Sequence, residues 1–120
     1  MRELNLNIDL DIKGEKNAEG KDVTCVEMAI LWIGVMLERS LNKPDPKTNR
    51  PTAQVGMEQQ RKYYKIMTAL EANVDGIVKM EDADYSFLSS KYHQAEMPIQ
   101  KGTSKGLVVI SDAINSAKEV

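Results

Sequence analysis

Single copies of histidine and cysteine limit the chemistry that this chain can perform. His93 is the only histidine and Cys25 the only cysteine, so a multi-histidine metal site and an intrachain disulfide are both excluded. Ser89 and Ser90 lie near His93 in sequence but on other faces of the expected helix, and no acid is placed to orient the ring. No His or Lys lies near Cys25 to activate it, which predicts an inert buried thiol. We therefore expect a protein that is not an enzyme and needs no cofactor.

Oxygen-bearing side chains recur near the N-terminus, at Asn7, Asp9 and Asp11. On one face of a strand they would stand about 7 Å apart and could contribute ligands for a hard cation. A single flat strand does not bring its ligands together, whereas acidic residues on a solvated face discourage wrong edge pairing. We expect the solvated face and no metal site.

A basic and aromatic cluster could bind phosphate and stack on a base. The segment from Lys43 to Lys65 has six basic and two acidic residues, and the alternative nucleic-acid site would use Arg61, Lys62, Tyr64 and Lys65. The other reading is the solvated face of an amphipathic helix, with Tyr63 in the core. The whole chain has a formal charge of −2, which weakens the electrostatic attraction that dominates such binding. We prefer the solvated face and keep nucleic-acid binding as the alternative function.

A glycine- and lysine-containing segment, Lys101–Gly106, precedes the last apolar stretch. Backbone N–H groups at a helix start together with two lysines can hold an anion. The segment lacks the Gly-Lys-Ser/Thr ending of a P-loop. We expect a loop over Glu96–Gly106, with Thr103 or Ser104 as the N-cap of the helix that follows.

The elements that must position these residues begin with an alternating N-terminal segment. Apolar and polar residues alternate from Leu4 to Ile12, which predicts a strand. Lys21–Val23 and Ile77–Met80 are its short candidate partners. An under-paired strand invites another chain to its free edge.

The central helix is predicted over Cys25–Leu41, with Thr24 as N-cap and Glu27 completing a capping box. Met28–Leu37 has no polar side chain, so this helix is apolar on every side and must be buried on every side. At about 1.5 Å per residue the run is too short to span a bilayer.

Three further helices are expected after a proline-rich loop at 42–54. The second spans about 55–73, and its apolar face is formed by Tyr63, Ile66, Met67, Leu70 and Val74. The third is capped by Glu81 or Asp82 and has Tyr85, Leu88 and Tyr92 on its apolar side, with Phe87 beside them. The last element is ambiguous, because Leu107–Ile110 alone would suit a strand. The longer pattern favours a helix with a face at Leu107, Ile110, Ile114 and Ala117. The 120 residues therefore predict one α+β domain, with an N-terminal strand or hairpin packed against the buried central helix.

The order of these elements resembles that of small proteins encoded among the virion genes of tailed phages. The resemblance rests on the strand segment Asp9–Gly14, on Lys21–Thr24 opening an apolar helix, and on Val74–Asp84 leading into a short helix. It covers roughly residues 4–95. It implies a non-enzymatic assembly, scaffold or accessory virion role, and assigns no functional residue.

Two features predict association with further copies of the chain and with other proteins. They are the under-paired strand and the helix that is apolar on every side, and together they place self-association at Leu4, Leu6, Ile8, Leu10, Ile12, Trp32 and Ile33. No apolar signal segment opens the chain, so we expect no membrane partner and a cytoplasmic location, in the host cell or the virion if the chain is phage-encoded.

Overall fold

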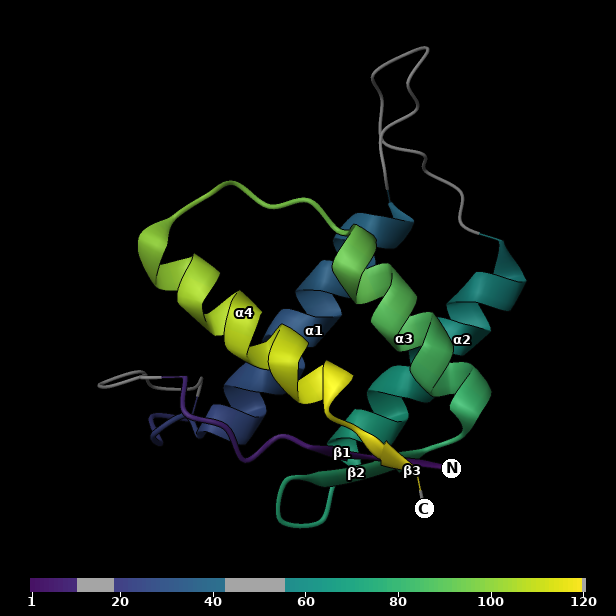
Figure 1. Ribbon diagram of the computed structural model, residues 1–120, viewed down its shortest axis with the longest axis horizontal. Helices are drawn as coiled ribbons and strands as arrows, with labels where there is room; N and C mark the ends of the chain where they lie inside the picture. The colour runs from purple at the N-terminus through teal and green to yellow at the C-terminus, as the bar shows by residue number, and fades with distance from the viewer. Residues whose placement is uncertain (11–18, 43–55, 120) are drawn as a thin grey trace.

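The computed structural model describes residues 1–10, 19–42 and 56–119, which form four helices and a three-stranded antiparallel sheet (Figure 1). The elements in chain order are β1 (Arg2–Asn5), α1 (Cys25–Leu41), α2 (Met57–Glu71), β2 (Ile77–Met80), α3 (Asp82–Gln94), α4 (Lys101–Asn115) and β3 (Lys118–Glu119). The predicted α+β class is confirmed. The proline-rich loop, apart from Asn42, lies outside the described residues.

The N-terminal strand is the middle strand of the sheet, whose order is β2-β1-β3. Arg2 lies opposite Met80 on β2 and opposite Glu119 on β3. The strand therefore has partners on both sides, and its second partner is the C-terminal segment, which sequence reasoning did not consider. Lys21–Val23 contributes only a bridging residue at Asp22 and no strand.

The strand predicted over Leu4–Ile12 is wrong in length, because β1 ends at Asn5. Leu6 still donates its N–H to the Gly76 carbonyl at 2.8 Å, but the Ile8 N–H then donates to the Leu6 carbonyl at 2.9 Å. A hydrogen bond across two residues is a γ-turn, which redirects the chain. Alternation of apolar and polar residues therefore continues after the strand itself has stopped.

The connection between α2 and β2 is a tight turn at Asn73–Gly76. Asp75 and Gly76 have φ values of 52° and 83°, in the region that glycine adopts at little cost. The Asn73 Oδ1 accepts from the Gly76 N–H at 3.0 Å, and the Asn7 Nδ2 donates to the Asp75 carbonyl at 2.6 Å. A Cβ on Gly76 would lie 2.6 Å from the Asn7 Oδ1, so this turn requires glycine for space as well as for conformation.

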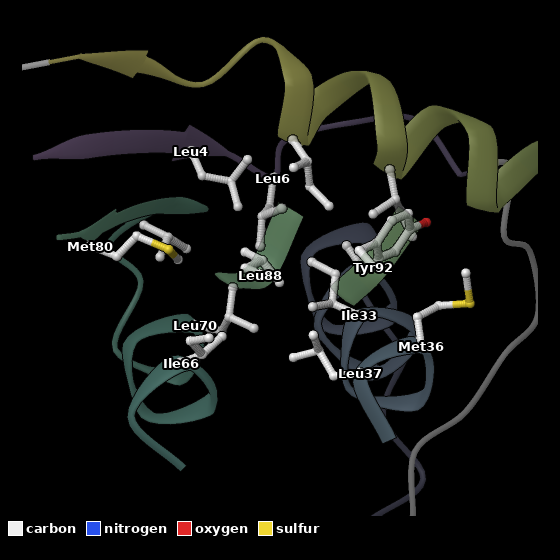
Figure 2. Close-up of a cluster of buried hydrophobic side chains, with 14 residues drawn as sticks. Leu4, Leu6, Ile33, Met36, Leu37, Ile66, Leu70, Met80, Leu88 and Tyr92 are labelled. Carbon is white, nitrogen blue, oxygen red and sulfur yellow. The ribbon is translucent and has the colours of Figure 1, made fainter. Parts of the chain in front are cut away.

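Helix α1 lies beneath the other helices and supplies much of the core. Its predicted bounds are confirmed, and the Thr24 Oγ1 accepts from the Glu27 N–H at 3.1 Å as the predicted N-cap. Its buried side chains join those of the sheet, α2 and α3 in one apolar cluster (Figure 2). The fully buried side chains of this core include Leu4, Leu6, Ile33, Leu37, Ile66, Leu70, Val78, Leu88, Ile110 and Ile114.

Helix α2 is shorter than the predicted 55–73, and one residue of its predicted face is misplaced. Ile66 and Leu70 are buried as expected, but Val74 is 71% exposed because it belongs to the turn that follows the helix. On the outer side, the Lys62 Nζ lies 3.5 Å from the Glu58 Oε1, the i,i+4 pair expected on a helix surface.

Helix α4 begins at Lys101, so the loop predicted over Glu96–Gly106 is wrong beyond Gln100. Thr103 and Ser104 lie inside the helix and cap nothing. Glycine costs about 1 kcal/mol in a helix, and packing overrides it here. Ile110 and Ile114 are buried, and the hydroxyls of Tyr92 and Tyr85 donate to carbonyls of α4, each at 2.7 Å.

We expect Ile33→Ala and Leu31→Ala, two residues apart on α1, to differ sharply in stability. Ile33 is fully buried, so its truncation should lower the free energy of unfolding by about 2–4 kcal/mol. Leu31 is 58% exposed, and its truncation should cost less than about 0.5 kcal/mol. Urea denaturation at low protein concentration measures both. Equal losses would contradict the assignment of Leu31 to the surface.

Candidate functional site

The outer face of α1 carries a row of apolar side chains. Met28, Leu31 and Val35 are spaced i, i+3 and i+7, and at about 100° per residue they point away from the buried Ile33 and Leu37. Leu31 is 58% exposed and the other two are half-buried. Within the described part of the chain, none of the three packs against the core cluster. Within residues 1–10, 19–42 and 56–119, the rest of the chain leaves Leu31 uncovered, so the predicted burial of α1 on every side is not reached by these residues alone.

A cleft of about 360 Å³ separates this outer face from the first turns of α4. Its α1 wall is apolar and its α4 wall is largely bare backbone, and the lining residues are Leu10, Met28, Leu31, Trp32, Gly102, Thr103 and Gly106. A Cβ built on Gly102 or Gly106 meets no atom within 4 Å. The chemistry of this cleft suits an apolar side chain, because few polar groups line it.

The residues predicted for self-association separate into three groups in the structure. Leu4, Leu6 and Ile33 have no exposed area, so the core of the single chain accounts for them and they offer no surface to a partner. Leu10 and Trp32 are half-buried and line the cleft, while Ile8 is half-buried and lines a separate hollow beside α4. Ile12 lies outside the described residues.

The basic region on α2 is neutralised in part by neighbouring carboxylates. The Lys65 Nζ lies 3.1 Å from the Asp84 Oδ2 and 3.3 Å from the Glu81 Oε2, and these two carboxylates raise the pKa of Lys65. Lys62 pairs with Glu58 and lies over the Phe87 ring at 5.4 Å. A phosphate would have to compete with these contacts. Arg61 and Tyr64 are exposed, and Lys43, Lys47 and Arg50 lie outside the described residues.

Tyr63, on the same helix as this basic region, serves the fold. Its hydroxyl donates to the Glu38 Oε1 at 2.8 Å and so ties α2 to α1. Burial, followed by the hydrogen bond to Glu38, raises the pKa of Tyr63 to about 12. Tyr63 was predicted in the core, but it is half-buried and packs against the core from a helix–helix contact. Tyr64 is the exposed tyrosine of α2.

We expect single- and double-stranded nucleic-acid probes to show no retardation at about 50 mM salt and micromolar protein. The reason is that Lys62 and Lys65 already face carboxylates. A gel-shift titration makes the measurement, with charge reversal at Arg61, Lys62 and Lys65 as the comparison. Salt-sensitive retardation that the reversal abolishes would restore the nucleic-acid alternative.

The histidine has a partner that sequence reasoning missed. The His93 Nδ1 lies 2.6 Å from the Ser89 carbonyl oxygen, and the Nε2 lies 2.7 Å from the Ser111 Oγ. With the proton assigned to Nδ1, the ring donates to that carbonyl and accepts from the Ser111 hydroxyl. Ser111 comes from α4, and nothing in the sequence pairs these two helix positions. His93 is exposed and a backbone carbonyl replaces the acid of a triad, so the contact serves to tie α3 to α4.

The remaining candidate residues are the polar side chains Asn7, Asp9 and Asp11, and the thiol of Cys25. Asn7 is occupied with the Asp75 carbonyl, Asp9 is exposed, and Asp11 lies outside the described residues. Across residues 1–10, 19–42 and 56–119, no three His, Cys, Asp or Glu side chains come together to hold a metal. Cys25 is half-buried at the start of α1. The Cys25 thiol is therefore less buried than the sequence predicted.

Comparison of the chain with protein-family models, curated proteins and solved structures finds no match. Within the described residues, every helix is too short or too polar to cross a membrane. The outer face of α1 and its cleft are therefore the candidate site on geometry alone.

Proposed function

We propose that this protein works by binding copies of itself and other proteins, as an assembly or accessory protein without catalytic activity. The observation that supports the proposal is the outer stripe of α1. An exposed leucine by itself is ordinary on a protein surface. Leu31 instead stands in a row with Met28 and Val35 at the spacing of a helix–helix seam, and it borders an apolar cleft.

The energetics of this stripe favour a partner. Burying a leucine side chain fully contributes about 1.5–3 kcal/mol, and the half-buried Trp32 at the edge of the cleft adds area of the kind enriched at protein interfaces. Charged residues flank the stripe, with Glu27 and Glu38 on α1 itself and Lys101 at the start of α4 all exposed. An apolar centre with a polar rim is the usual composition of an interface.

The resemblance to small phage virion proteins gives this activity a biological setting. We place the protein, as part of the same proposal, among accessory or assembly factors that act in the host cytoplasm or the virion. The nucleic-acid alternative has less support, because two of the three cations it requires already contact carboxylates.

We expect the mass of the protein in solution to exceed that of one chain and to rise with concentration. Burial of the α1 stripe drives association, so dilution should reverse it. Light scattering after size exclusion measures the mass over a concentration series. A protein that remains monomeric at about 100 µM, with a cooperative thermal transition, would refute self-association.

A further inference from the structure

We propose that the partner on the outer face of α1 is a second copy related by a two-fold axis. In this dimer the Leu31 side chain of each copy occupies the cleft of the other, over Gly102 and Gly106. The inference rests on the proposed self-association and names its partner and its geometry.

The first argument is shape. Leu31 projects from α1 at the edge of the cleft, and Gly102 and Gly106 lie one turn apart on α4 at its other wall. The space where their side chains would stand is open, since a Cβ at either glycine meets nothing within 4 Å. Bare backbone allows a neighbouring chain to approach closely. One face of the molecule thus carries both an apolar projection and an apolar hollow of helical backbone.

The second argument is symmetry. In a two-fold interface the same patch serves both partners, so each residue that inserts must find its receptor on that same patch. Leu31 is itself the projection, and it also lines the hollow. A two-fold axis beside Leu31 therefore allows the Leu31 side chain of each copy to enter the cleft of the other copy. To bind a different protein, this face would need either the hollow or the projection, but not both. The presence of both therefore favours a second copy of this chain as the partner.

The third argument is charge. Glu27 lies one turn before Leu31 on the α1 side, and Lys101 lies on the α4 side, both exposed. A two-fold rotation brings α1 of one copy towards α4 of the other, so the acidic side of each patch meets the basic side of its partner. Such pairs contribute little energy when exposed, but they fix which surfaces meet and in what orientation.

The test compares dimer dissociation constants by sedimentation equilibrium for the full chain. We expect Leu31→Asp to raise the constant at least about 100-fold, because a charge enters the apolar hollow. Gly106→Leu should raise it at least about 10-fold by filling the hollow, while its own fold is kept because the new side chain points into open space. Val108→Asp is the matched control. Val108 is also 58% exposed, but it does not line the cleft. The dimer dissociation constant of this variant should therefore stay within about threefold of the wild-type value.

A charge-swap pair tests the symmetry separately. Glu27→Lys alone, and Lys101→Glu alone, each place like charges across the two-fold axis and should weaken their own dimers. Mixed together, the two variants restore opposite charges at both contacts and should form heterodimers more tightly than either forms homodimers. A thermal melt of each variant confirms that it folds.

The possible failures are distinguishable. A wild-type chain that stays monomeric refutes the proposed function itself. A wild-type dimer whose constant is unchanged by Leu31→Asp and Gly106→Leu leaves self-association intact and overturns this interface. A wild-type mass that grows beyond the dimer, or a charge-swap mixture with no heterodimer, overturns the two-fold geometry.

Discussion

The structure depends on burial of one side of α1. Helices α2, α3 and α4 each contact α1, and the apolar side chains of the sheet belong to the same buried cluster as Ile33 and Leu37, so all these elements share a single core (Figure 2). This sharing explains why short strands suffice. A sheet with strands of two to four residues would be marginal alone, but here its buried Leu4 and Val78 side chains belong to the same core as the helices.

Sequence patterns predicted those parts of the fold that local chemistry determines. The bounds of α1 and β2 were both confirmed, because a cap, a turn and an uninterrupted apolar run specify them within a few residues. The strand β1 was overextended, because apolar alternation continues through Leu6 and Ile8 after a turn has ended the pairing. The start of α4 was missed, because the glycines suggest a loop, while contacts with α3 stabilise the helix from a distance.

The candidate site was predictable only in part. The excess of apolar residues on α1 drew attention to that helix, and Trp32 and Leu10 line the cleft. Which side of the helix faces outward depends on where the other helices pack, so Ile33 was assigned to a partner although it belongs to the core. The proximity of Leu31 to the glycines of α4 appears only when two distant segments are placed together. The contact between His93 and Ser111 could not be predicted from sequence patterns, because it also joins two segments that are distant in the chain.

The central position of β1 has a consequence for the order in which the protein forms. Its two neighbours come from the middle and the far end of the chain, so Arg2 pairs with Glu119 across nearly the entire sequence (Figure 1). Contacts of such long range form slowly, because the closure of the intervening loop must precede them. A ribosome synthesises β1 long before Lys118 and Glu119, so the second edge of β1 stays uncovered until that segment has emerged. Until then, the edge can pair with other chains.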